Sequence, residues 1–276
     1  MAGDVIQEAA VTTVPVVAAP AESKKRSRLY HGRFMTMYVL LGLALVATVA
    51  GLVMALEVTL SPKQVWSSWK PADGNADQRT TQIAQHTGAL YQLPSGNQML
   101  DVIPKKLTVP LVDASGKSQA VPIAGVILRQ KSGAGDKVAV LSSTDSRLFQ
   151  LCGTGASCAI GEGKASVARG RLVRREALQL ALLTFKYVPG ISHVIEFMPP
   201  PPGSQPSLVT YFEKQDLRAQ LSAPLRTTLS AKTPTASAIT PAESARIDKL
   251  TTGHVYTFTF RTTQLGQAVL LLTRAY

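Results

Sequence analysis

The sequence predicts an α+β fold: one N-terminal transmembrane helix, then an exported domain with a mostly antiparallel sheet and packed helices. Two observations lead to this prediction. Residues 35–56 form an uninterrupted apolar run without a charged side chain. After it, short runs rich in Val, Leu and Ile, separated by glycine-rich turns, alternate with a few helical patterns. Such alternation favours hairpin-connected strands with helices packed on the sheet.

The apolar run is long enough to cross a membrane. As a helix it extends about 33 Å at about 1.5 Å per residue, and a hydrocarbon core is about 30 Å thick. A cleaved signal peptide has an apolar core of only about 7–15 residues close to the start of the chain. We therefore expect residues 35–56 to be an uncleaved signal-anchor helix in a cell membrane.

Basic side chains precede this helix and predict its orientation. They are Lys24, Lys25, Arg26, Arg28 and Arg33. The positive-inside bias places the N-terminus in the cytoplasm and the C-terminal part outside. Residues 1–34 carry neither helical nor alternating periodicity, so we expect a disordered basic cytoplasmic tail.

Small residues recur every four positions within the helix, at Ala47, Gly51 and Ala55. A stripe of this kind lets a second helix approach closely, so homo-oligomerisation through the membrane helix is one expectation. The alternative is that the stripe has no role, because small residues are common in transmembrane helices.

Residues 57–97 are expected to form a juxtamembrane segment with a helix over 76–91 and a turn after it. Trp66 and Trp69 lie near its start, flanked by Lys63 and Lys70. Tryptophan is enriched at membrane interfaces, which predicts that both residues anchor the chain there. The alternative is that both belong to a protein core.

Residues 98–276 are expected to form the exported domain. Strand patterns occur at 99–103, 107–112, 121–128, 138–141, 147–151, 192–198 and 207–212, with a terminal hairpin over 255–260 and 268–272. Helical patterns occur at 166–187, 216–221 and 242–250. Thr240 and Glu243 have the spacing of a capping box before the last of these helices, with Pro241 at its first position.

The two cysteines, Cys152 and Cys158, predict a disulfide closing a short loop in an oxidising compartment. A redox pair is the alternative, although the spacing is not C-x-x-C. No third ligand has the spacing of a metal site, so we expect no metal and no cofactor. Gly153 and Gly155 match the first two glycines of the phosphate-binding motif G-x-G-x-x-G. We reject nucleotide binding because the expected half-cystine Cys158 replaces the last glycine and no βαβ unit is expected to follow.

A cluster of basic residues near the start of the 166–187 helix is the best candidate for an anion- or partner-binding site. Its members are Lys164, Arg169, Arg171, Arg174 and Arg175. The last three share one helix face by the i, i+3, i+4 rule. Cations in the first helical turns oppose the macrodipole, so their position suggests a use. The alternative is a solvated basic face, partly neutralised by Glu162 and Glu176.

Two further features admit functional and structural interpretations. Residues 199–202 are four successive prolines, which could dock to an aromatic groove or form a stiff loop. His86, His193 and His254 stand alone in the sequence; the last two could meet Glu196 or Asp248 in space and so form part of a catalytic site.

The formal net charge of +12 favours anionic partners. The sequence therefore predicts a single-pass protein that contacts membrane lipid and acts as a non-enzymatic binding or assembly factor in the cell envelope. The expected partner is an envelope protein or an anionic polymer, without specific nucleic-acid binding. The alternative is an envelope hydrolase whose active-site residues come from distant parts of the chain.

Overall fold

The computed structural model describes residues 26–60, 65–105, 108–112, 118–132, 135–264 and 266–275. Residues 1–25, most of the expected cytoplasmic tail, lie outside the described residues. The chain divides into two compact units, Met1–Lys63 and Gln64–Tyr276.

The N-terminal unit contains one long helix, α1 (Arg26–Leu60). Its segment Phe34–Leu52 is long and apolar enough to cross a membrane, and none of it is buried against protein. The hydroxyl of Thr48 bonds back to the carbonyl oxygens of Ala44 and Leu45 at 2.9 and 2.8 Å. This polar side chain therefore needs no external partner in an apolar environment. Ala47, Gly51 and Ala55 all lie on α1, and the pairing of two such helices stays a prediction.

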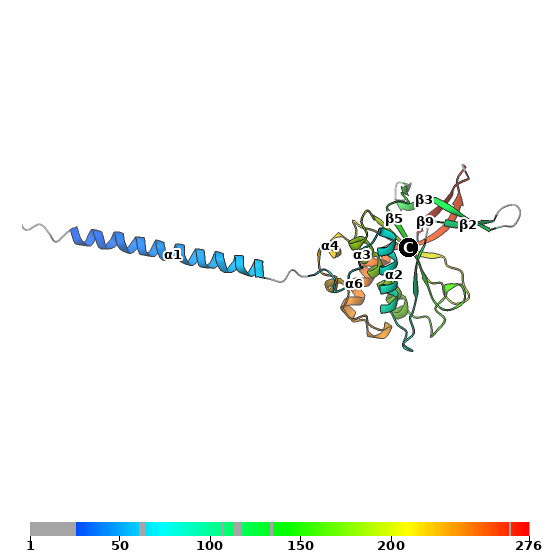
Figure 1. Ribbon diagram of the computed structural model, residues 1–276, viewed down its shortest axis with the longest axis horizontal. Coiled ribbons are helices and arrows are strands. Elements are labelled where there is room, and N and C mark those ends of the chain that lie inside the picture. Colours follow the sequence, from blue (N-terminus) through cyan, green and yellow to red (C-terminus); the bar gives the residue numbers. More distant parts are fainter. Residues whose placement is uncertain are drawn as a thin grey trace, which may run out of the picture. The chain divides into compact units, whose positions relative to one another are not determined.

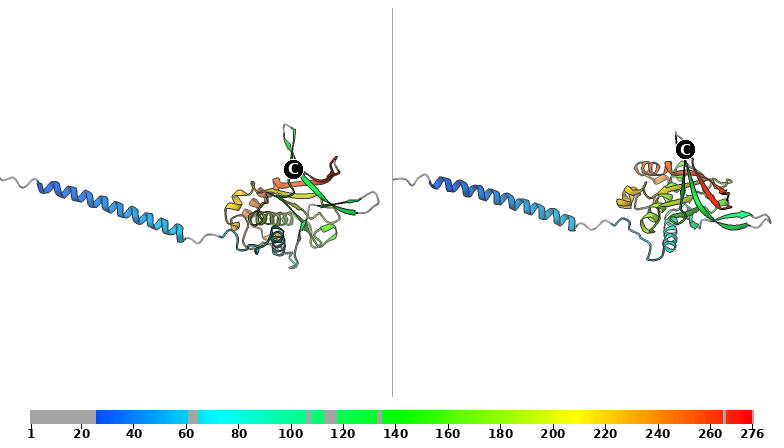
Figure 2. Two further views of the ribbon diagram at one scale, coloured as in Figure 1. Left: turned by 45° about the horizontal axis from the view of Figure 1, so that its top comes forward. Right: turned by 90° about the horizontal axis from the view of Figure 1, so that it is seen from above.

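The C-terminal unit combines a nine-stranded sheet with helices, as the predicted α+β class requires. The strands are β1 (Asp101–Lys105), β2 (Thr108–Val112), β3 (Ser118–Ser132), β4 (Gly135–Leu141), β5 (Ser146–Cys152), β6 (His193–Phe197), β7 (Leu208–Glu213), β8 (Val255–Thr262) and β9 (Ala268–Arg274). Their order is β1-β5-β6-β7-β8-β9-β3-β2, and β4 pairs with β3. Figure 2 shows β2 and the adjoining part of β3 as a two-stranded ribbon projecting from this unit.

The sheet is mixed because two strand pairs are parallel. Hairpin neighbours such as β6 and β7 or β8 and β9 are antiparallel, but β5 pairs with β6 and β3 with β9 in parallel. The helix α3 (Val167–Tyr187) connects β5 to β6. The segment β5–α3–β6 is thus a βαβ unit, and our expectation that none follows the cysteine loop was wrong. Periodicity identified the strands and the longer helices but could not specify pairing between strands distant in sequence.

Consecutive residues of the central strands enter two different cores because side chains alternate across a sheet. Val194 contacts the core under the helices, whereas Ile195 belongs to the core on the other face. Helices α2 (Ala76–Leu90), α3 and α6 (Pro241–Thr251) lie side by side in Figure 1, with α3 in the middle. The short helices are α4 (Arg218–Ser222), α5 (Leu225–Thr228), η1 (Ala156–Cys158), η2 (Ala236–Ala238) and η3 (Thr252–His254).

Side-chain caps begin the longer helices of this unit. Asn75 and Gln78 form a complete capping box at α2. The hydroxyl of Ser166 accepts a hydrogen bond from the Arg169 amide at the start of α3. At α6, Thr240 caps the Glu243 amide, but the Glu243 carboxylate turns inward to Arg175 instead of completing the predicted box.

Candidate functional site

The loop after β5 is closed by a disulfide between Cys152 and Cys158, as predicted. Its glycines serve the close packing of this loop. A Cβ added at Gly153 would lie 2.3 Å from the carbonyl oxygen of Ala159, and one at Gly155 would lie 2.8 Å from it. The α3 helix begins only after this loop, with Ser166 as its N-cap. The glycines therefore have a structural reason that does not involve phosphate.

The N-terminal turns of α3 separate the predicted arginine cluster into two groups. Each residue turns a helix by about 100°, so Arg174 and Arg175 lie about 60° and 40° to opposite sides of Arg171. The side chains of Arg171 and Arg174 are 25% and 24% exposed, whereas that of Arg175 is 1% exposed. Lys164 is exposed and precedes the helix. Only part of the cluster can therefore meet a partner at the surface.

A cleft of about 640 Å³ lies beside these turns, between α3, the end of α6, the first residue of β8 and the loop joining β6 to β7. Arg169, Arg171 and Arg174 all line it. Apolar wall residues come from five places in the sequence: Ile160, Val173, Met198 with the prolines 199–202, Leu208 and Val255. Three members of the basic cluster and the proline tract, which the sequence suggested separately, thus border one cleft, whereas Lys164 and Arg175 do not line it.

The charges at the cleft do not cancel. Asp248 accepts hydrogen bonds from Arg171 Nη2 at 2.8 Å and Arg174 Nη2 at 2.6 Å. Hydrogen bonding to Arg171 is the main reason why the pKa of the Asp248 carboxyl is lowered. Arg174 Nε also donates to Thr251 Oγ1 at 3.1 Å. No hydrogen bond or ion pair to the guanidinium of Arg169 occurs within the described part of the chain. One carboxylate therefore faces three guanidinium groups.

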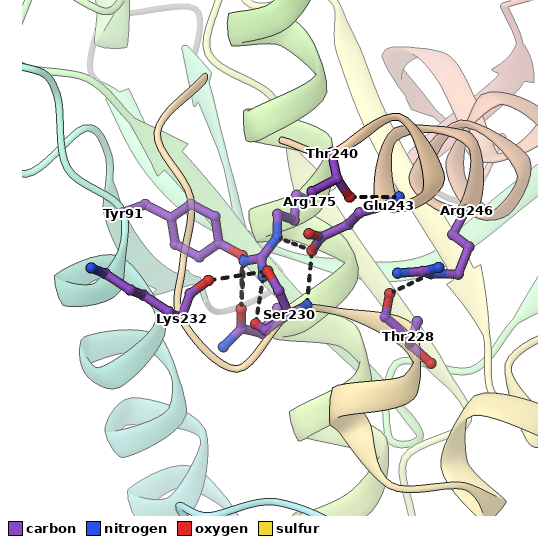
Figure 3. A network of polar contacts seen from close by, with 9 residues as sticks. Tyr91, Arg175, Thr228, Ser230, Lys232, Thr240, Glu243 and Arg246 are labelled. Atoms are coloured by element: carbon purple, nitrogen blue, oxygen red, sulfur yellow. Dashed lines mark hydrogen bonds and ion pairs between the residues drawn. The ribbon is translucent and has the colours of Figure 1, made fainter. Parts of the chain in front are cut away.

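Arg175 instead organises a buried network that connects α2, α3, α6 and the loop after α5 (Figure 3). Its Nε donates to Glu243 Oε1 at 2.8 Å, and Nη1 donates to the Tyr91 hydroxyl at 2.6 Å. Nη2 donates to the carbonyl oxygen of Ser230 at 2.9 Å. Glu243 Oε1 also accepts the Ser230 amide at 2.9 Å. We therefore leave Arg175 out of the proposed binding surface.

The network also determines the ionisation of Glu243. Burial by itself would raise the pKa of this carboxyl, but hydrogen bonds from the Ser230 amide and Arg175 outweigh it and lower the pKa. Glu243 is consequently a carboxylate paired with a buried guanidinium. Such a pair holds elements together but leaves neither group free for chemistry.

Two further glutamates are buried and have no cationic partner among the described residues. Glu176 on α3 and Glu196 on β6 are both 0% exposed. Burial raises the pKa of each well above its usual value, and the charge of Glu196 raises that of Glu176 further. Thr210 donates to Glu196 Oε2 at 2.6 Å, whereas neither carboxylate oxygen of Glu176 has a hydrogen-bond partner in the part of the chain that the structure describes. Glu176 therefore does not neutralise a surface basic face, contrary to the interpretation that grouped it with Glu162.

The buried glutamates lie next to the cleft in the fold. Glu176 follows Val173 by about one turn of α3, and Glu196 precedes Met198 by two residues on the same sheet face. Val173 and Met198 line the cleft, but neither glutamate does. The sequence analysis did not identify this buried pair. The one available signal was the position of Glu176, an acidic residue at the edge of the apolar stretch of α3.

The histidines do not lie at the cleft. His193 Nδ1 is 3.0 Å from the Tyr211 hydroxyl, and its Nε2 is 3.7 Å from Asp145 Oδ2. His254 Nδ1 donates to the carbonyl oxygen of Tyr211 at 3.0 Å. Neither histidine has the Glu196 or Asp248 partner that the sequence suggested. The geometry at the cleft therefore contains guanidinium groups and apolar walls but no imidazole.

Trp66 and Trp69 pack against the helical core of the C-terminal unit. The Trp66 ring meets Tyr187 edge to face at 5.8 Å between centroids, and its indole N–H donates to the carbonyl oxygen of Gln220. Trp69 stacks on His86 at 3.8 Å. A contact of either ring with a membrane interface stays a prediction.

The chain matches no protein-family model, no curated protein and no solved structure. The function proposed below therefore rests on the geometry of the cleft.

Proposed function

We propose that this chain is a single-pass membrane protein whose C-terminal unit lies outside the cytoplasm and acts as a non-enzymatic binding or assembly factor of the cell envelope. The observation that carries the proposal is the cleft of about 640 Å³ with apolar walls and three arginines. Ligand sites in proteins have volumes of about 300–1,000 Å³ and combine apolar walls with a few polar groups that orient the ligand.

Two features support the proposed location. The basic residues before the apolar helix favour a cytoplasmic N-terminus. The disulfide between Cys152 and Cys158 suits an oxidising compartment on the other side of the membrane. In this arrangement the helix keeps the cleft close to envelope components.

The cleft can be blocked without removing a charge. Gly170 lines it, and a Cβ added there meets only Arg174 Nη1, at 4.0 Å. Gly170→Leu should fill part of the cleft and, because leucine favours helix more than glycine, stabilise α3 by about 0.5–1 kcal/mol. Ala245→Leu, at an exposed position on α6, is the matched control.

The test is photocrosslinking of the full chain in native membranes. A photoreactive amino acid replaces Leu208 in the cleft or, as a control, exposed Lys214 beyond the other end of β7. We expect a specific adduct at position 208 that Gly170→Leu abolishes and Ala245→Leu preserves. Equal adducts at positions 208 and 214, or an adduct that Gly170→Leu leaves unchanged, would show that the cleft is not the binding site.

A further inference from the structure

We propose that the cleft binds an anionic amphiphile, a molecule with one carboxylate or phosphate group and a single apolar chain. This inference rests on the proposed function and names the class of ligand. It follows from two properties of the cleft that occur together: an excess of positive charge and a wall formed by apolar side chains.

Arg169 contributes to the excess of positive charge at the cleft. Its guanidinium has no hydrogen bond or ion pair among the described residues, although it lines a cleft that already contains Arg171 and Arg174. Asp248 compensates one positive charge, so two remain. Guanidinium groups form paired hydrogen bonds with carboxylate and phosphate oxygens. The cleft is therefore electrostatically complementary to an anionic head group.

Part of the cleft wall is apolar and comes from β8 and the segment between β6 and β7. Leu208 and Val255 supply side chains that cannot hydrogen-bond, and Met198 adds a thioether, which is only a weak acceptor. The prolines 199–202 add rings and have no backbone N–H to offer a ligand. A sugar polymer or a polar peptide would lose hydrogen bonds with water at this wall and would find no side-chain donor there to replace them, which is costly. An alkyl chain loses none and gains from leaving water.

Size distinguishes among amphiphiles. A volume of about 640 Å³ is that of a site for a small organic ligand. It suits one apolar chain better than the two chains of an intact phospholipid. A fatty acid and a single-chain phosphate ester share the required chemistry, and the experiment separates the contribution of the chain from that of the head group.

The probe is a fatty acid carrying a diazirine on its chain, added to the full chain in nanodiscs of phosphatidylcholine, whose head group has no net charge. Photolabelled residues are located by peptide mass spectrometry. We expect labels at cleft residues such as Met198 and Leu208. The corresponding diazirine alcohol should label them at least about tenfold less, since it lacks the charge-assisted hydrogen bonds. Unlabelled dodecyl phosphate should compete, and inorganic phosphate at the same concentration should not.

Two variants test the two halves of the site. Arg169→Gln should weaken labelling by the fatty acid about tenfold but leave labelling by the alcohol unchanged. Arg218→Gln, which removes an equal charge from exposed α4, should change neither. Gly170→Leu should reduce labelling by both probes.

The outcomes separate this inference from the proposed function. Equal labelling by acid and alcohol, or labels spread over the surface, would overturn the amphiphile proposal. So would full competition by inorganic phosphate, which would indicate a site for the anion alone. A protein adduct at position 208 in native membranes, without fatty-acid labelling, would support the binding function and reject this ligand class.

Discussion

Replacing Arg175 by methionine should destabilise the C-terminal unit by about 3–5 kcal/mol, the usual cost of removing one partner from a buried ion pair. The variant keeps an unbranched apolar stem but loses the donors to Glu243, Tyr91 and Ser230. Glu243, 2% exposed, then retains the Ser230 amide as its remaining hydrogen-bond donor in the network. Since domains are stable by about 5–15 kcal/mol, this is a large part of the total.

Tryptophan fluorescence of the full chain in dodecyl maltoside, titrated with urea, measures the effect. The sequence contains two tryptophans, Trp66 and Trp69, and both pack in the C-terminal unit, so the signal reports its unfolding. Glu243→Gln is the second single variant to be measured, because glutamine keeps the shape of the side chain without its charge. The double variant should lose less stability than the sum of the two single variants, since it leaves no unpaired carboxylate.

The pH dependence of stability provides an independent test of the same ion pair between Arg175 and Glu243. In the wild type, the pKa of Glu243 is lower in the folded chain than its usual value of 4.5. The charged carboxylate therefore stabilises the fold at pH above 4.5, and this stability is lost as pH falls through the pKa of the folded chain. Without Arg175, burial should raise the pKa, so the variant recovers stability as Glu243 takes up a proton. A loss below about 1 kcal/mol, strictly additive variants, or a difference independent of pH would refute the reasoning.

Three further predictions concern groups away from the Arg175 network. Because burial and Glu196 raise the pKa of Glu176, the folded chain keeps a proton that the unfolded chain releases above its usual 4.5. Wild-type stability should then fall as pH rises above 4.5, by about 1.4 kcal/mol per pH unit for each proton that the folded chain retains, and the advantage of Glu176→Gln in urea unfolding should grow in the same direction; parallel pH profiles would contradict this. The double change Cys152→Ser and Cys158→Ser opens a loop of sequence separation 6 and should cost about 2 kcal/mol in the same assay, whereas no loss would mean that the bond constrains nothing. Ser157 has φ of 55°, so Ser157→Gly should stabilise the chain by about 0.5–1 kcal/mol, and a lower unfolding midpoint would reject strain at this residue.

The sequence alone determined the local properties of this protein. The apolar run predicted a helix able to cross a membrane because a long uncharged stretch has few other stable environments. Period 3.6 predicted α3 and period 2 predicted most strands, since each pattern places apolar side chains on one face. The disulfide between Cys152 and Cys158 was predictable because a flexible loop of only five residues separates the two cysteines.

Only the tertiary structure decided which of these local features act together. The same basic stretch of α3 contributes Arg174 to a cleft and Arg175 to the interior, because adjacent residues point about 100° apart and meet different neighbours. Those neighbours come from distant segments: Asp248 and Glu243 from α6, and Tyr91 from the end of α2. The cleft, the parallel pairings and the buried Glu176–Glu196 pair are likewise contacts between segments far apart in sequence. Periodicity specifies which face of an element is apolar, but the packing of elements against one another specifies which residues meet.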